Sequence, residues 1–293
     1  VPEGLFQTRS YQSCVNELYK AGSVRTIATF SDFVFENTIT GNLIFLFSKN
    51  QKVKTRKWHF NNNYELCEII DSDDKILRRI LSKNTIPLKS VCFVFKGMVV
   101  KDRDVVVSDS HSKGKDIFLL GKSITKWNII TKFFTNYNKL EIIGGTKQKT
   151  KHEHYPRILI RRTGNTLCCV FLEEPALTES TLYSCWSTAE YVSNKYLLAL
   201  LNSRLLDYYV KKLMITNKQA FPQILMSDLE TLPLRIIEQG EQKPFITLVD
   251  QILAAKQKDP DADTSTLEKH IDQMVYKLYD LTPEEIAIIE GRE

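Results

Sequence analysis

Residues 156–171, PRILIRRTGNTLCCVF, decide the fold. Two apolar runs of strand length, residues 157–162 and 167–171, flank Gly164 and Asn165, which suit a tight turn. We therefore predict an antiparallel hairpin. Successive side chains of a strand alternate between its faces, so Cys168 and Cys169 should point to opposite sides.

Helical and strand patterns extend on both sides of this hairpin. The clearest helix is residues 194–213, with apolar residues at helical spacing and Asn194 as a possible N-cap. Amphipathic helices are predicted at 244–256 and 266–279, and Pro283 can open another after Thr282. The part before the hairpin predicts helices at 11–20 and 74–82 and strands at 24–30, 43–47, 90–95 and 116–120.

These patterns predict an α+β protein. We expect residues 1–50 to be the edge of a larger sheet, because three elements cannot build a core alone. Residues 51–63 are basic and then rich in asparagine, which is typical of a linker. Residues 64–238 then form a mixed sheet-and-helix domain, and residues 239–293 form a small helical tail. Because the chain begins at Val1 without a methionine, we expect it to derive from a longer protein.

The charge distribution is uneven although the net charge is only +5. Residues 238–293 carry 13 acidic and 6 basic side chains, a charge of −7, which leaves +12 on the first 237 residues. Residues 122–165 hold ten basic side chains against Glu141 and Glu153. A solvated face and a polyanion-binding surface both fit such a cluster, and neighbouring aromatic residues such as Trp127 and Tyr155 favour the polyanion.

Composition excludes some classes of protein. No apolar run approaches the length needed to span a bilayer, and we expect a cytoplasmic protein that is not bound to membranes. The six cysteines lack metal-like spacing, so we expect buried free thiols.

A self-contained active site is also missing from the sequence. None of the eleven glycines are spaced as Gly-x-Gly, and no Pro-Pro pair is present, so neither a cofactor-binding glycine loop nor an Asn-Pro-Pro-aromatic loop occurs. His152 and His154 do not complete a metal site, and we expect them to be exposed loop histidines. We expect no enzymatic activity, metal or cofactor in this chain alone.

Several segments together resemble one family. Residues 156–164, Thr181-Leu182-Tyr183, residues 196–209 and Leu232-Pro233-Leu234 resemble the target-recognition region of the TaqI-like adenine-specific DNA methyltransferases and the fused type IIG restriction enzymes. Residues 1–48 resemble the end of their catalytic domain, and residues 271–285 resemble their helical ending. The order of the segments is more specific than any one of them.

The resemblance implies a function and partners. It implies sequence-specific recognition of double-stranded DNA within a restriction-modification enzyme whose N-terminal catalytic domain uses S-adenosylmethionine to methylate adenine. Phe35 matches the aromatic residue that stacks on the flipped adenine, although packing at a sheet edge would also explain it.

The same resemblance places the DNA contacts in and after the basic segment. We expect the lysines to neutralise phosphates and the arginines, with nearby polar residues, to reach base edges. One of Arg161 and Arg162 should face inward and pair with an acid. The expected contacts are Lys139, Lys147, Lys149, Lys151, Arg157, Arg161, Arg162, Thr163, Asn165, Lys218 and Gln219.

Two other classes of protein stay open. A protein-interaction module would dock through its acidic helical tail, with the basic body incidental. A nuclease would need a carboxylate cluster for metal ions, which the sequence does not show.

Overall fold

The structure, a computed structural model, describes residues 5, 12–30, 43–49, 56–60, 66–70, 75–81, 84–109, 114–216 and 222–292. Phe35, Lys218 and Gln219 lie outside the described residues. No helix in these ranges has both the length and the apolar character that a membrane crossing requires.

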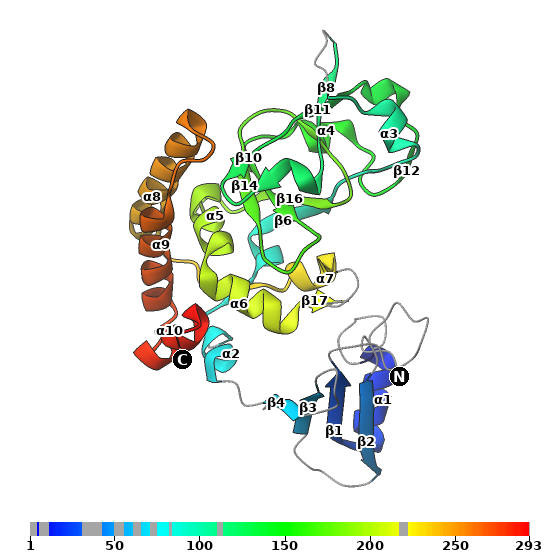
Figure 1. Ribbon diagram of the computed structural model, residues 1–293, viewed down its shortest axis with the longest axis vertical. Helices are drawn as coiled ribbons and strands as arrows, with labels where there is room; N and C mark the ends of the chain where they lie inside the picture. Colours follow the sequence, from blue (N-terminus) through cyan, green and yellow to red (C-terminus); the bar gives the residue numbers. More distant parts are fainter. Residues whose placement is uncertain are drawn as a thin grey trace.

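The N-terminal elements form a small unit with its own sheet. Helix α1 packs beside a sheet of strand order β2-β1-β3-β4, in which β1 and β3 run parallel and the other neighbours are antiparallel. Its buried apolar residues are Val24, Ile27 and Leu43. Figure 1 shows this unit, drawn in blue, apart from the larger body. The bounds are α1 Gln12–Ala21, β1 Gly22–Phe30, β2 Leu43–Lys49, β3 Arg56–Phe60 and β4 Leu66–Ile70.

One of these strands differs from the sequence prediction. Residues 51–63 were expected to be a linker, but β3 lies within them and pairs with both β1 and β4. The basic and polar composition of Arg56–Phe60 hides the strand, because pairing on both sides satisfies its backbone without an apolar pattern. The proposed domain boundaries stay predictions.

An antiparallel four-stranded sheet forms the centre of the larger body. Its order is β14-β13-β16-β6, and β13 and β14 form the predicted hairpin, with Ile160 opposite Cys169. Gly164 in the connection has a φ of +117°, a conformation that side chains disfavour. Cys168 and Cys169 belong to different buried clusters, as predicted. The bounds are β6 Cys92–Lys96, β13 Arg157–Arg161, β14 Cys169–Leu172 and β16 Leu182–Ser187.

Two helices occupy the segment that was predicted as one. Helix α5, Asn194–Asn202, ends at Ser203, and α6, Arg204–Leu213, begins there. Ser203 is extended, with ψ of 150°, and its hydroxyl accepts a hydrogen bond from the backbone N–H of Leu206. The N-cap of α5 is Ser193 rather than Asn194, whose side chain accepts from the backbone of Ser187. The apolar periodicity continues across the break and so conceals it.

The helical tail packs on α5. Helices α8 (Gln239–Lys258) and α9 (Ser265–Leu278) lie along one side of the body, and α10 (Pro283–Glu290) follows them (Figure 1). Phe245, Val249, Ile271 and Val275 join the main core, which also contains α5 and the helix-facing side of the central sheet. Thr282 and Glu285 form a capping box around Pro283 at the start of α10.

Short helices and strands surround this core, and they include the basic residues 139–151. The described residues therefore form mixed helices and antiparallel sheets, and the predicted α+β class is confirmed. The short helices are α2 Lys75–Ile80, α3 Arg103–Val106, α4 Lys149–Glu153 and α7 Met226–Leu229, with 3-10 turns at Leu88–Ser90, Gly121–Ser123 and Tyr137–Lys139. The short strands are β5 Ile86–Pro87, β7 Val99–Val100, β8 Asp116–Leu119, β9 Ile124–Thr125, β10 Asn128–Ile129, β11 Phe133–Thr135, β12 Ile142–Gly144, β15 Leu177–Thr178, β17 Ile215–Thr216, β18 Gln223–Ile224 and β19 Pro233–Leu234.

Candidate nucleic-acid interface

The basic segment 139–151 is tied to the body by its backbone. Strand β12 pairs with β7, and the N–H of Thr146 donates to the carbonyl of Lys96 at 3.2 Å. Gly145 has a φ of +71°, and a Cβ there would lie 2.1 Å from the carbonyl oxygen of Gly97. Only glycine permits this close approach, so the chain passes directly against β6.

Arg157, expected to contact DNA, is instead fully buried. Its guanidinium donates to the carbonyls of His152 at 2.6 Å and Ala176 at 2.5 Å, and also to the carbonyl of His154. Burial lowers the pKa of Arg157 to about 10. The expectation of a DNA contact is wrong for Arg157 in this structure. Its geometry suits a different role, because it holds the carbonyls at the end of α4 and fixes the exit of the basic segment.

His152, expected to be exposed, is also buried. Its Nδ1 accepts from the backbone N–H of Thr178 at 3.1 Å, so Nε2 carries the proton and donates to the carbonyl of Thr146 at 2.9 Å. Burial, opposed by the Thr146 bond and reinforced by Arg157, lowers the pKa of His152 to about 4. His154 is exposed as expected, and its ring stacks on Trp186 with centroids 4.0 Å apart.

The four candidate lysines fall into two groups. Lys139 and Lys147 are exposed and have no ion-pair partner in the described part of the chain. Lys149 pairs with Asp116 at 2.8 Å, and the hydrogen bond to this carboxylate raises the pKa of Lys149. Lys151 lies 5.2 Å from the centroid of the Phe93 ring. Lys139 and Lys147 are therefore the freer of the four to meet a phosphate.

Of the remaining candidates, Arg162 and Thr163 directly follow β13 and lie against Gln223 and Ile224 of β18. The carbonyl of Arg162 accepts from Ile224, and Gly164 donates to the carbonyl of Pro222 at 2.9 Å. The guanidinium of Arg162 donates to the side-chain oxygen of Gln223 at 2.5 Å. Asn165 is exposed in the turn. Lys218 and Gln219 lie in the sequence between β17 and β18, which pair with each other, but fall outside the described residues.

Arg161 and Arg162 do not divide as expected. Arg161 donates to the backbone carbonyl of Ile124, and neither arginine has an acidic hydrogen-bond partner in the described ranges. Arg161 therefore pairs with a backbone carbonyl at the start of β9, where the alternation of side chains along the strand had predicted an acidic partner. Both arginines are half-buried, but the Nε of Arg161 is fully buried, so Arg162 is the better placed of the two for an outside partner.

Lys96 connects the two groups of candidates. Its carbonyl receives the N–H of Thr146, and its ammonium lies near Arg162. Burial and the charge of Arg162 lower the pKa of Lys96, while Glu179 opposes them. The carboxylate of Glu179 is held by Thr181 N–H at 2.8 Å. Lys96 of β6 and Arg162, which directly follows β13, thus bring two cationic groups together beside the backbone of the basic segment.

A cleft of about 420 Å³ opens beside this cluster. Thr163 and Thr181 line it together with Lys122, whose ammonium lies 4.7 Å from the centroid of the Phe133 ring. Arg103 also lines it and pairs with Asp104 at 3.1 Å, and both Asp104 and Asp109 belong to the lining as well. Hydroxyl groups and cations in one cleft can donate hydrogen bonds to phosphates and to base-edge acceptors.

The sequence prediction missed several of these residues. Lys96, Arg103, Thr181 and Gln223 come from four separate segments, and nothing in their spacing predicts that they meet. Lys122 belonged to the basic run but was not singled out. The described residues hold no group of acidic, histidine or cysteine side chains that could bind a metal ion.

Comparisons with known proteins show a similar fold for the whole chain and match a family model to part of it. The fold is similar to that of the Type IIL restriction-modification enzyme MmeI, whose structure was solved in complex with DNA. The TM-score is 0.66 and the identity 12%, over 99% of this chain and 48% of MmeI. Residues 116–234 match the TaqI-like C-terminal specificity domain, and the resemblance seen in the sequence is confirmed for this segment.

Two further structures show weaker likeness. The type IIG restriction endonuclease BpuSI has a TM-score of 0.41 and 12% identity over 96% of this chain and 47% of its own. The HsdS subunit from Thermoanaerobacter tengcongensis has a TM-score of 0.40 and 14% identity over 67% of this chain and 44% of its own. The chain therefore spans about half the length of each protein. No curated protein matched.

Proposed function

We propose that this chain recognises a specific sequence of double-stranded DNA for a restriction-modification enzyme. The observation that carries the proposal is the meeting of Lys96, Arg162 and the basic segment beside the cleft that Thr163 lines. The specificity-domain match over residues 116–234 supports it independently.

The residues divide by the kind of contact that each can make. Lys139 and Lys147 are long, exposed cations that suit phosphates, which position a protein on the duplex. Arg162 and Gln223 present a guanidinium and an amide held in fixed relation by their own hydrogen bond. Arginine favours guanine and glutamine favours adenine in the major groove. We therefore assign sequence reading to this pair, together with Thr163 and Asn165 after Arg162 and Lys218 and Gln219 before Gln223 in the sequence.

In the whole protein, the catalytic residues would lie in another domain. We propose that a catalytic domain N-terminal to this chain transfers a methyl group from S-adenosylmethionine to adenine, with Phe35 against the flipped base. This chain contributes DNA binding and holds no cofactor itself. The whole protein acts in the cytoplasm.

Binding of a labelled duplex to the purified chain tests the proposal. Fluorescence anisotropy should show binding at about 50 mM salt that weakens steeply by about 200 mM, because each phosphate contact releases condensed counterions. Addition of S-adenosylmethionine should give no methyl transfer by this chain. Absence of duplex binding at the lower salt concentration would overturn the proposal.

A further inference from the structure

Tyr183 of β16 lies on the same face of the central sheet as Arg162. In the antiparallel pairing of β13 with β16, Tyr183 is opposite Ile160. Arg162 follows Ile160 by two residues, and its N–H continues the ladder by donating to the carbonyl of Thr181 at 2.9 Å. Because side chains two apart on a strand share a face, the Tyr183 phenol and the Arg162 guanidinium are diagonal neighbours.

The hydroxyl of Tyr183 is both a donor and an acceptor. Only 2% of this residue is exposed, and the hydroxyl donates its proton to the backbone carbonyl of Ile224 at 2.9 Å. The oxygen lone pairs remain free to accept, and the guanidinium of Arg162 forms a hydrogen bond with the phenol. Burial raises the pKa of Tyr183, while the charge of Arg162 and this hydrogen bond oppose the effect. The bond to Ile224 therefore orients the oxygen that Arg162 meets.

The Arg162 guanidinium thus has two protein partners. One is the side-chain oxygen of Gln223, which accepts from Arg162 at 2.5 Å, and the other is the phenol of Tyr183. The N–H of Ile224, the residue after Gln223 in β18, also donates to the carbonyl of Arg162 at 2.9 Å. A guanidinium held at two points has few orientations, and a fixed orientation is what a fork of hydrogen bonds to one base requires.

We propose that Tyr183 is a positioning residue for DNA sequence recognition, which fixes the direction in which Arg162 presents its guanidinium to a base. This inference rests on the proposed function, because that function gives Arg162 its reading role. Tyr183 is itself buried and acts through Arg162 rather than by touching DNA. Loss of its hydroxyl should therefore change the discrimination between sequences and leave the contacts to phosphates as they are.

Tyr183→Phe tests this role, because it removes one oxygen atom and keeps the buried ring. Competition anisotropy measures the ratio of affinities for a duplex with the preferred sequence, obtained by selection from a random pool, and for a scrambled duplex. The variant should lower this ratio about fivefold, the lower end of what one bidentate arginine contact supplies, with the salt slope unchanged. In an Arg162→Ala background, Tyr183→Phe should not change the ratio further, because the tyrosine acts through the arginine.

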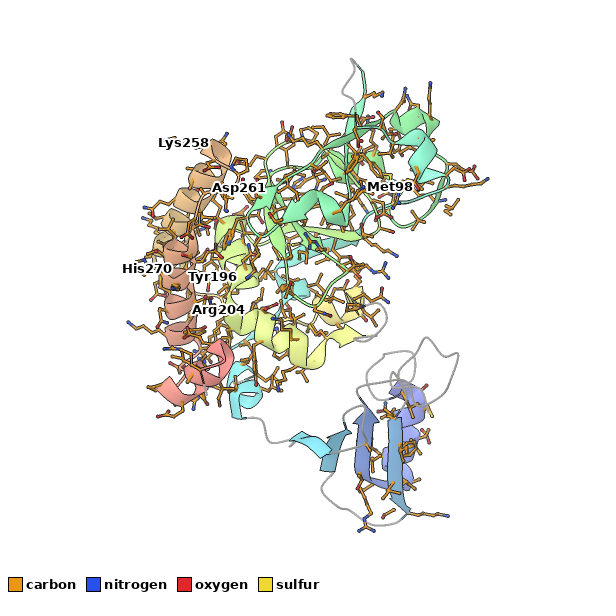
Figure 2. The ribbon with its side chains drawn as sticks, in the orientation of Figure 1. Met98, Tyr196, Arg204, Lys258, Asp261 and His270 are labelled. Carbon is orange, nitrogen blue, oxygen red and sulfur yellow. The ribbon has the colours of Figure 1, made fainter. Side chains whose placement is uncertain are left out.

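Tyr196→Phe is the matched control for the loss of a buried hydroxyl. Tyr196 is fully buried on α5, and its hydroxyl donates to the backbone carbonyl of Arg235 at 2.6 Å. Its ring packs against Phe245 of α8 with centroids 5.2 Å apart, and Figure 2 shows Tyr196 beside the tail helices. Urea unfolding should show a similar loss of stability in both variants, whereas Tyr196→Phe should keep the wild-type ratio of duplex affinities.

The possible results separate this role from the proposed function. A wild-type chain that binds no duplex, or that has no preferred sequence, contradicts sequence recognition and the role of Tyr183 with it. A wild-type chain that discriminates, together with an unchanged ratio in Tyr183→Phe, contradicts the positioning role alone. The role is also wrong if Tyr196→Phe lowers the ratio equally, or if Tyr183→Phe lowers it as far in the Arg162→Ala background, because a general structural effect then explains the loss.

Discussion

The Nε of Arg79 donates to Oε1 of Glu285 at 3.0 Å, across 206 residues of sequence. Arg79 lies on α2, which follows the N-terminal unit, and Glu285 lies in the first turn of α10. Glu285 is buried and also accepts from the backbone N–H of Thr282 at 2.8 Å. This contact joins the first helix of the larger body to its last, so the C-terminal tail braces the entry to the recognition domain.

Changes at this contact should affect stability unequally. Glu285→Ala removes both the ion pair and the capping box and should lower the free energy of unfolding by about 2 kcal/mol. Arg79→Ala should cost about 1 kcal/mol or less, because the Arg79 side chain is 38% exposed. Urea unfolding measures both, with Lys277→Ala as the control. Equal losses would contradict a separate capping role for Glu285.

Arg157 should be needed for stability rather than for direct DNA contact. Arg157→Lys cannot reach all three carbonyls and should lower the free energy of unfolding by about 3 kcal/mol, because buried acceptors lose their donors. Lys139→Ala, at an exposed position, should leave stability unchanged and weaken duplex binding. Urea unfolding and anisotropy separate the two effects. Native stability together with lost DNA binding in Arg157→Lys would place this residue in the interface after all.

Stability should fall as acid is added because of His152. The pKa of His152 is about 4 in the folded protein, below the ordinary histidine value of 6.5, so the unfolded chain binds a proton more readily. The contribution of neutral His152 to the free energy of unfolding has its full value above about pH 6.5. It is lost progressively as the pH falls to about 4, by at most about 3 kcal/mol. Asp272 opposes this, because burial raises its pKa to about 6 and favours folding as that carboxyl protonates.

Comparison of wild type with His152→Gln isolates the histidine contribution. Glutamine can still accept from Thr178 and donate to Thr146 but does not titrate. The difference in unfolding free energy between the two proteins should shift in favour of the glutamine variant as the pH falls from 6.5 to 4. A difference independent of pH would show that His152 does not remain neutral in the fold.

Lys147 and Arg162 should affect DNA binding in different ways. Lys147→Ala should weaken binding to all duplexes alike and lower the salt slope by about one, as the loss of a phosphate contact requires. Arg162→Ala should cost about 1–3 kcal/mol on the preferred sequence and less on others. Competition anisotropy with matched and scrambled duplexes distinguishes them. A uniform effect of Arg162→Ala would assign it to the backbone.

The sequence predicts local elements better than it predicts the site. The hairpin at Gly164 and the capping box at Thr282 depend on neighbouring residues, and both are present. The break at Ser203 was missed because the apolar pattern continues across it from α5 into α6. Arg157 was misplaced because composition does not reveal three backbone carbonyls that converge on it. The cluster at Lys96 depends on strand order, which no single segment encodes.

Selection from a random pool of duplexes tests the central claim most directly. The purified chain should enrich a single short motif through successive rounds at near-physiological salt, and Arg162→Ala should enrich a relaxed version of that motif. Duplex binding that enriches no motif in the wild-type chain would contradict sequence recognition and leave only nonspecific attraction to DNA.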